Sequence, residues 1–278
     1  MLPRLALSGC VRAYLGRSTR GVSLAYAQRL NRFPASPLCA ITWFLHGECR
    51  MLPWHEGVPP EEAAGEPLAP VLFNGAYDRP SMSVSCGEGQ AFMLLLLPDA
   101  FQALTGHDAG RWRNQAVPAE QVFDAAWLPL FQAVRQADND SARMALVEDF
   151  LAPRWAGVRR DGPAMLRSTH DWAQALALRA ATSGLGRSVR QMERRIKAWS
   201  GLPLRDLRSL ARAEQSYYQA RQAHREGRLD WARVAQTSGY ADQSHFCRET
   251  RRVTGYSPQA LRVLVDTDES FWLYRIWG

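Results

Sequence analysis

The spacing of apolar and polar residues changes near position 100, from the short runs of β-strands to the longer period of helices. Cys39–Leu45 is a short apolar run rich in β-branched and aromatic residues, and Ala91–Leu97 is a second one that stops at a proline. Met82–Ser85 alternates apolar and polar residues, as a half-buried strand does. Proline, glycine and glutamate over 58–70 predict an exposed loop. Residues 24–100 are therefore predicted to form strands and turns.

Helical patterns follow this region and continue to a break that separates two predicted domains. The apolar positions predict helices over 100–104, 119–137 and 141–152. From Gly157 onward, glycines, a proline and charged residues interrupt the pattern, which indicates a linker. We therefore expect an N-terminal domain over 1–156, a linker over 157–167 and a C-terminal domain over 168–278.

The C-terminal domain contains a capped amphipathic helix. Ser188 stands where an N-cap belongs, and Gln191 three residues later completes a capping box. The helix itself is predicted over 189–199, with Met192 and Ile196 on its buried face.

Two further helices flank this one. A helix is predicted over 170–182, and a long one over 204–227 follows. At about 1.5 Å per residue the long helix spans roughly 30 Å. Successive major-groove faces of B-DNA lie about 34 Å apart. A single chain can therefore present two reading helices to DNA without dimerising.

A second helical pair follows the long helix. Its short supporting helix buries Val234 and ends at Gly239, where the left-handed conformation is easiest without a side chain. Asp242 is placed to cap the next helix, and Phe246 is predicted to point inward. A supporting helix, a polar turn and a reading helix form a helix-turn-helix unit.

These fixed spacings resemble the AraC/XylS family of bacterial transcription regulators. The resemblance rests on Gly239, Asp242, Ser244, Phe246, Arg248, Gly255, Pro258 and Arg262. Ser188, Arg190, Met192, Arg194 and Ile196 are similar to the family's first reading helix. Arg32–Pro37 and Leu97–Gly106 are more weakly similar to the sensory domains of one AraC-like subgroup.

The resemblance implies a fold and a function. The expected fold is an α+β N-terminal sensory domain of barrel-like strands and helices, followed by an all-α domain. That second domain would hold two helix-turn-helix units joined by a long helix. The expected function is sequence-specific regulation of transcription, as an activator by analogy. Double-stranded DNA is the expected partner, and RNA polymerase, a small-molecule effector and a second copy of the chain are compatible with the resemblance.

The residues expected to contact DNA are polar side chains on the outward faces of the two reading helices. Arginine can pair with guanine, glutamine with adenine, and a carboxylate with cytosine N4. Glu193 is also compatible with a salt bridge to a neighbouring arginine. The base-reading candidates are Arg190, Gln191, Glu193, Arg194, Lys197, Gln243, Ser244, His245, Cys247 and Arg248. The phosphate-contact candidates are Arg187, Arg251 and Arg252.

The distribution of charge agrees with DNA binding by the C-terminal part. Residues 165–262 contain 18 arginines and lysines against 8 acidic residues, whereas the rest of the chain contains 16 against 19. Only one part of the chain is therefore expected to face phosphates. No apolar run approaches the roughly 20 residues of a membrane span, so no membrane partner is expected.

The remaining chemistry-bearing residues do not predict a catalytic or metal site. Five scattered cysteines form no CxxC pair, which fits a reducing cytoplasm. His46, Cys49 and His55 lack a further ligand at suitable spacing. Cys39 lacks basic neighbours that would activate it as a methyl-accepting nucleophile. We therefore expect no cofactor, no metal and no enzymatic activity.

Three features leave alternatives open. Five aromatic residues are compatible with an apolar ligand pocket, although core packing is favoured for them: Trp43, Phe44, Phe73, Tyr77 and Phe92. The aromatic tail Phe271–Trp277 is predicted to be a packing strap, with a dimer or domain contact as the alternative. Thr250 stands where the family usually has an aromatic residue, so the second unit is expected to pack differently, for instance against Trp272 or Trp277.

Two other functions fit the same chain. One is an adaptor that recruits RNA polymerase without any effector. The other is an enzyme whose N-terminal domain acts on a small molecule and whose helical domain regulates its own operon.

Overall fold

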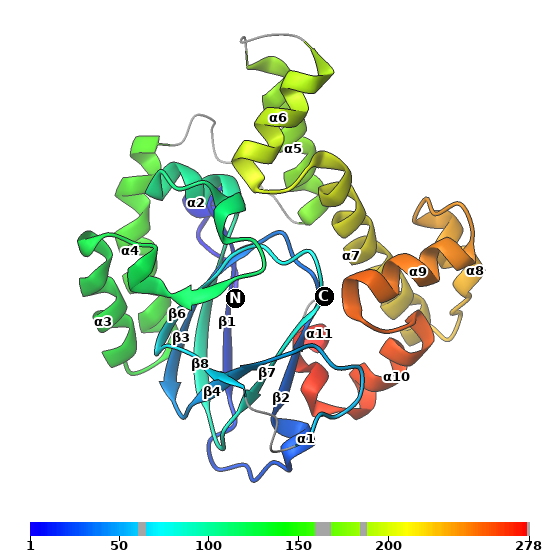
Figure 1. The fold of residues 1–278 in the computed structure, drawn as a ribbon, viewed down its shortest axis with the longest axis horizontal. Helices are drawn as coiled ribbons and strands as arrows, with labels where there is room; N and C mark the ends of the chain where they lie inside the picture. The colour runs from blue at the N-terminus through cyan, green and yellow to red at the C-terminus, as the bar shows by residue number, and fades with distance from the viewer. Residues whose placement is uncertain (61–64, 159–167, 184–187, 277–278) are drawn as a thin grey trace.

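The structure is a computed structural model that describes residues 1–60, 65–158, 168–183 and 188–276. A β-rich part with attached helices comes first, and a helical part follows it along the chain and flanks the sheets (Figure 1). The predicted fold class is therefore confirmed.

The strands form two antiparallel sheets. The five-stranded sheet has the order β1 (Val11–Ser18), β8 (Gln90–Leu96), β3 (Cys39–His46), β6 (Val71–Asn74) and β9 (Ala116–Pro118). The four-stranded sheet has the order β2 (Leu30–Phe33), β7 (Ser81–Ser85), β4 (Cys49–Leu52) and β5 (Glu66–Pro67). The three predicted strands correspond to β3, β7 and β8. The short strand β5 lies inside the predicted loop 58–70, where it pairs with β4.

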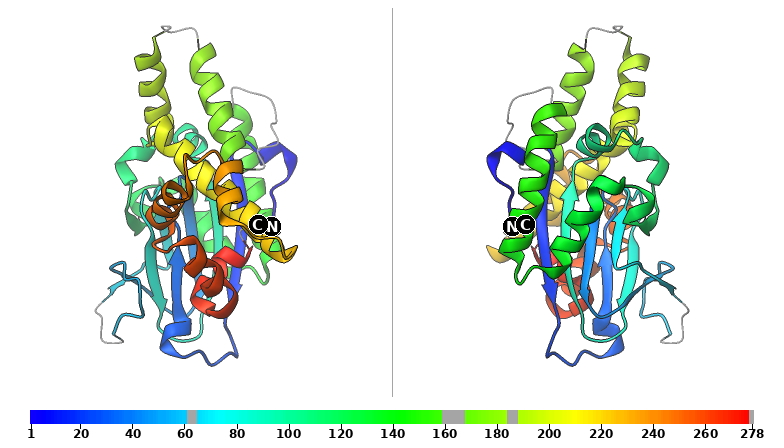
Figure 2. Two further views of the ribbon diagram at one scale, coloured as in Figure 1. Left: turned by 90° about the vertical axis from the view of Figure 1, so that its right-hand side faces the viewer. Right: turned by 90° about the vertical axis from the view of Figure 1, so that its left-hand side faces the viewer.

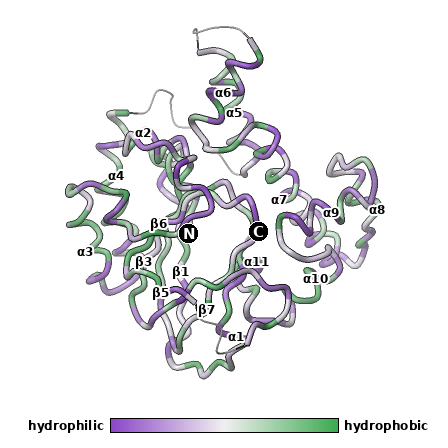
Figure 3. The backbone as a smooth tube through the Cα atoms, viewed as in Figure 1, coloured by the Kyte–Doolittle hydropathy of each residue, from purple (hydrophilic) through white to green (hydrophobic). Residues whose placement is uncertain are grey.

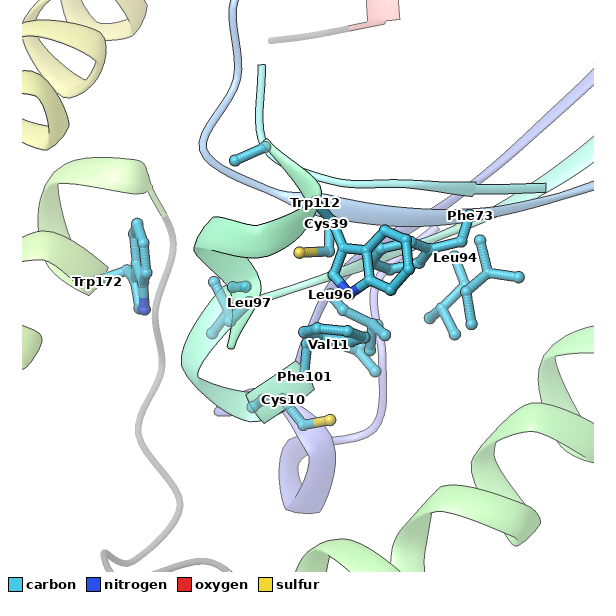
Figure 4. Packing of buried hydrophobic residues seen from close by; sticks show 14 of the residues in the cluster. Cys10, Val11, Cys39, Phe73, Leu94, Leu96, Leu97, Phe101, Trp112 and Trp172 are labelled. Carbon is cyan, nitrogen blue, oxygen red and sulfur yellow. The ribbon is translucent and has the colours of Figure 1, made fainter. Parts of the chain in front are cut away.

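One face of the five-stranded sheet is covered by helices. These are α2 (Pro98–Thr105), α3 (Leu128–Gln136) and α4 (Asp140–Val158). Phe73 stacks on Phe101 of α2 with ring centroids 4.8 Å apart, and both side chains are fully buried (Figure 4). Trp43 and Phe92 are buried in the same core, which confirms core packing for three of the five aromatic residues.

Two of the predicted helices have different bounds. The segment 119–137 begins as two single turns, η3 (Ala119–Gln121) and η4 (Ala125–Trp127), before α3 starts with a proline in its first turn. The helix predicted over 141–152 continues through Pro153, and Trp155 beyond it packs against the core. Residues 157 and 158 of the predicted linker are thus helical, and 159–167 lie outside the described residues. The division into domains stays a prediction.

Short elements complete the N-terminal part, and helices make up the described residues of the C-terminal part. The short elements are η1 (Leu5–Leu7), α1 (Tyr26–Arg29) and η2 (Ala109–Trp112). The later helices are α5 (Thr169–Thr182), α6 (Val189–Ser200), α7 (Leu204–Arg225), α8 (Trp231–Thr237), α9 (Gln243–Thr254), α10 (Pro258–Thr267) and α11 (Trp272–Ile276), with η5 (Glu269–Phe271) before the last. Among the helices described, none has the length and the apolar run that crossing a bilayer requires.

The helical part extends away from the sheets at two places. Helices α5 and α6 project together beyond the sheets, and α7 runs from them to the group formed by α8, α9 and α10 (Figures 1 and 2). Polar residues are frequent along α6, α7 and α9, and apolar residues are frequent in the strands (Figure 3).

The aromatic tail returns to the four-stranded sheet. The Trp272 indole Nε1 donates to Asn31 Oδ1 at 2.9 Å, and its ring lies edge-on to Phe33 of β2. The tail is therefore a packing strap that lies against the four-stranded sheet. Trp272 does not lie beside Thr250, where it was one of two expected partners. Trp277, the other, lies outside the described residues.

Candidate nucleic-acid interface

Helix α6 has the capping and burial that its sequence predicts. Ser188 Oγ accepts from the Gln191 backbone N–H at 3.3 Å, and the Gln191 side chain accepts from the Ser188 N–H, so the capping box is confirmed. Ile196 is fully buried and Met192 is half-buried. The helix ends at Gly201, whose φ of 75° is left-handed.

The opposite face of α6 is a row of exposed polar side chains. Arg190, Gln191, Glu193, Arg194 and Lys197 are all exposed. Glu193 makes no ion pair with any residue that the structure describes, so within this part of the chain its carboxylate has no charged partner. The N-terminal end of α6 lies at the tip that projects from the sheets, where DNA can reach it (Figure 2).

Helix α9 follows the same plan. Asp242 Oδ1 accepts from the His245 backbone N–H at 2.6 Å, which confirms the predicted N-cap. Phe246 is 2% exposed and packs against Tyr240, with ring centroids 5.2 Å apart. Gly239 has a φ of 72° and follows Ser238, the C-cap residue of α8. Gln243, Ser244, Arg248 and Arg251 are exposed on the outer side.

Three predicted contact residues on α9 are less available than their neighbours. The His245 ring folds back edge-on to Tyr240 and is half-buried, as is Cys247. Arg252 is exposed but pairs with Glu249 at 3.2 Å and donates to Ser209 Oγ at 2.8 Å. Arg187 lies outside the described residues. The roles of all these residues in DNA binding stay predictions.

The structure adds an arginine stripe on α7 that the sequence reading missed. Arg205 and Arg208 are exposed, and Arg212 donates to the carbonyl of Gly239 in the turn of the second unit. Residues three and four apart share a helix face. The stripe therefore runs along α7 toward the second reading helix, and its spacing was the signal that could have revealed it.

The C-terminal end of α6 is seated on the N-terminal part of the chain. A Cβ on Gly201 would lie 2.8 Å from the backbone nitrogen of Gly110 in η2, so the two backbones touch. Helix α5, which packs beside α6, is held by Asp99 of α2. That carboxylate accepts from Trp172 Nε1 at 2.8 Å and pairs with Arg179 at 2.8 Å.

The C-terminal end of α9 is seated in a comparable way. The Ala35 backbone N–H donates to the carbonyl of Val253 at 2.7 Å. Gly255, which ends α9 with a φ of 85°, lies directly beneath Trp54; a Cβ there would be 2.0 Å from that ring. Arg32 is buried against Trp54 and donates to the backbone carbonyl of His55 at 2.7 Å. Each reading helix is thus held at its C-terminal end, and its exposed polar side chains lie on the face turned away from the core.

A large cavity lies between the two sheets. Its volume is about 780 Å³, within the range of small-molecule sites. The five-stranded sheet contributes apolar side chains such as Leu15 and Met93, and the four-stranded sheet contributes Ser81 and Ser83. Helices α7 and α11 complete the wall. Phe44 and Tyr77 line this cavity, so these two of the five aromatic residues do face a pocket.

A second, small cavity lies beside Thr250. It measures about 90 Å³ and is bordered by Phe246, Val253, Leu261 and Tyr274. Thr250 is 8% exposed, so its short side chain is buried at the cavity wall. The structure thus leaves a space beside Thr250 that a larger side chain would fit, and packing that differs from the family's stays a prediction.

The cysteines and the possible metal ligands are the remaining groups that could support catalysis or metal binding. Burial raises the pKa of Cys39 to about 12 and that of Cys49 to about 11, so neither is a thiolate at neutral pH. Among the residues that the structure describes, no three side chains of the metal-binding types come together.

Comparisons with known proteins identify the helical part. Residues 181–263 match a family model described as a helix-turn-helix domain. Among solved structures, the chain is similar to ToxT from Vibrio cholerae at 11% identity, covering 89% of this chain and 97% of that one with a TM-score of 0.39. It is also similar to ToxT from Vibrio cholerae bound to an unsaturated fatty acid, at 10% identity, covering 91% and 95% with a TM-score of 0.38. A third structure is the AraC-like transcriptional activator CuxR, at 12% identity, covering 94% and 90% with a TM-score of 0.28. A search of curated proteins gave no match.

Proposed function

From the premise that this chain is a DNA-binding transcription regulator with a helix-turn-helix domain of the AraC/XylS family, we propose how it reads DNA and how it is controlled. Helices α6 and α9 enter successive major grooves on one side of the duplex. A small molecule in the cavity between the sheets controls this binding. By analogy with the AraC/XylS family, the regulator activates transcription by contacting RNA polymerase.

The observation that carries the proposal is the matched construction of α6 and α9. Each begins at a side-chain cap, buries apolar side chains on one face (Ile196 in α6, Phe246 and Val253 in α9) and ends at a left-handed glycine. Each presents exposed arginine and glutamine on the opposite face. Two such faces on one chain, joined by the 22 residues of α7, fit the spacing of adjacent grooves.

The exposed side chains divide into base readers and phosphate contacts. Arg190, Arg194 and Arg248 are suited to guanine, and Gln191 and Gln243 to adenine. Glu193, which is unpaired within the described protein, is suited to cytosine N4. Arg251 and the α7 stripe of Arg205 and Arg208 are suited to phosphates, which add affinity and salt dependence but little sequence choice.

The cavity favours control by an effector over an effector-free adaptor. Helix α7 forms part of the cavity wall through Glu214 and Tyr218, and α7 is also the helix that joins the two reading units. A bound molecule that contacts α7 can therefore change the relative position of α6 and α9. It does so to the extent that it binds one arrangement more tightly than another.

A binding-site selection from random double-stranded DNA tests the DNA-binding proposal. We expect one preferred sequence with two conserved segments, and an affinity that falls steeply with salt. Arg205→Ala should weaken binding to all sequences and reduce the salt slope by about 1. The matched control is Arg20→Ala, an exposed arginine of the N-terminal part. Selection of no preferred sequence, or salt-independent binding, would overturn the proposal.

A further inference from the structure

One arginine of the large cavity has an unused hydrogen-bonding group. The Arg17 guanidinium carbon lies 4.6 Å from the centroid of the Trp272 ring, and Nη2 lies 3.4 Å from Glu269 Oε1. Its Nη1 is buried and has no hydrogen-bond partner among the described residues. A buried donor without a partner costs free energy, so this atom is a favourable place for an acceptor.

The charges around Arg17 are unbalanced. Glu269 is held more closely by Arg275, at 2.7 Å, so two guanidinium groups share one carboxylate. Among the described residues, the cavity wall carries five arginines against two glutamates. One of these carboxylates, Glu214, already accepts from the Tyr218 hydroxyl at 3.1 Å. Burial lowers the pKa of Arg17 to about 10, so this side chain is still charged at neutral pH.

The wall beside Arg17 combines this charge with apolar surface. Leu15 belongs to the same strand, Met93 lies on the neighbouring strand β8, and Phe44 lies on β3, the next strand of the sheet. The C-terminal tail, residues 269–276, contributes Trp272, Leu273, Arg275 and Ile276 to the same wall. A molecule that fills this end of the cavity therefore touches both the sheet and the tail.

We propose that the cavity binds a small molecule with an anionic group and an apolar body, that the anionic group pairs with Nη1 of Arg17, and that the bound molecule holds the tail against the sheet. This inference rests on the proposed effector site and names the class of its ligand. A ligand that binds only when the tail lies against the sheet stabilises that arrangement by mass action.

The tail connects this site to the second helix-turn-helix unit. The Tyr217 hydroxyl of α7 donates to the carbonyl of Tyr274 at 2.6 Å, and Arg221 donates to the same carbonyl at 3.0 Å. Tyr274 is fully buried in one cluster with Tyr256, the residue after the glycine that ends α9. Holding the tail in place therefore holds the end of the second reading helix.

Calorimetric titration of the full chain tests the ligand class with a matched pair of probes. 1-Naphthylacetate and 1-naphthylacetamide have the same body and differ in charge. The wild type should bind the acid at least about 10-fold more tightly than the amide, because the acid makes a charge-assisted bond. Arg17→Gln should lose this preference, Arg17→Lys should keep part of it, and the control Arg20→Gln should keep all of it. Equal binding of acid and amide by the wild type, or an unchanged preference in Arg17→Gln, would overturn the assignment.

Hydrogen exchange of the tail tests the second half of the proposal. With the acid bound, residues 269–276 should exchange more slowly, and with equal concentrations of the amide they should change much less. Unchanged or faster exchange with the acid bound would contradict a role in holding the tail. Neither experiment contains DNA, so a failure here is distinct from a failure of the binding-site selection.

Discussion

The two helix-turn-helix units have the same local construction but differ in how far each is built into the large hydrophobic core. In the first unit, Ile196 and Leu202 are buried in the large core that also contains Phe101 of the N-terminal part. In the second unit, Phe246 lies in a small separate cluster with Val234 and Tyr240. The first unit is therefore built into the N-terminal part, whereas the second joins that core only through Val253 at the end of α9 and otherwise packs in a small cluster of its own.

The contacts that hold the two units against the N-terminal part also differ, and those of the first unit are the more rigid. Gly201 of the first unit lies against the backbone of Gly110, while the second is seated by the Trp54 ring and one hydrogen bond from Ala35. A ring on a loop can shift more easily than a backbone in a packed core. The second unit can therefore shift against the N-terminal part more easily than the first, and the tail reaches that second unit through Tyr274.

The largest expected loss of stability comes from truncating one buried side chain in each unit. Phe246→Ala should cost about 3–5 kcal/mol and Ile196→Ala about 2–5 kcal/mol, since both side chains are buried. Hydrogen exchange should show the difference between them. Phe246→Ala should speed exchange in α8 and α9 and leave α6 protected, whereas Ile196→Ala should affect α6 together with α2. Equal loss of protection in both units after Phe246→Ala would contradict a separate cluster around Phe246.

The contact of Trp54 with the end of α9 can be tested at Gly255, the glycine that ends this helix. Gly255→Ala adds a clash with Trp54 to the roughly 1–2 kcal/mol that a left-handed alanine costs. Gly227→Ala is the matched control, because Gly227 has a φ of 67° and an added Cβ there would meet nothing within 4 Å. Chemical denaturation should show a larger loss for Gly255→Ala than for Gly227→Ala, and the excess should shrink in a Trp54→Ala background. Equal losses at the two glycines would show that Trp54 does not seat the unit.

A smaller, stabilising effect is expected at the small cavity. Thr250→Leu extends an apolar side chain into about 90 Å³ of space and should stabilise the second unit by about 0.5–2 kcal/mol. Thr267→Leu is the control, because Thr267 is exposed at the end of α10. The gain in stability is measured by thermal unfolding of each variant and by the rate of hydrogen exchange in α9. Destabilisation by Thr250→Leu would mean that the second unit is already fully packed.

The smallest perturbation is thiol labelling of the native protein. Cys86 is exposed and Cys247 on α9 is half-buried, so both should react without unfolding. Cys10, Cys39 and Cys49 should react only on unfolding, because they are buried and burial raises the pKa of each thiol. Bound operator DNA should protect Cys247 and leave Cys86 unchanged. Protection of both thiols, or of neither, would place the DNA elsewhere.

The sequence predicted the features that depend on neighbouring residues. The caps at Ser188 and Asp242 and the inward position of Phe246 follow from local spacing, and the structure confirms them. Strand β1 was missed because its apolar residues are interrupted by Arg12 and Arg17, which face a cavity that only the complete fold creates.

Contacts between distant segments were beyond the sequence. The position of Trp54 over Gly255 and the return of Trp272 to β2 depend on how the sheets and helices assemble. His245 was expected on the outer face, but the Tyr240 ring offers it a closer partner. The DNA-contact residues themselves stay predictions, because only their exposure is established.

The central claim is that α6 and α9 read two separate parts of one operator. Binding-site selection with Arg194→Ala and with Arg248→Ala tests it directly, since each arginine is exposed on a different reading helix. Each variant should lose base preference in one segment, at a cost of about 1–3 kcal/mol per base pair, and the two segments should lie about one helical turn apart. Loss of preference in the same segment, or a uniform loss of affinity without any change in preference, would contradict the claim.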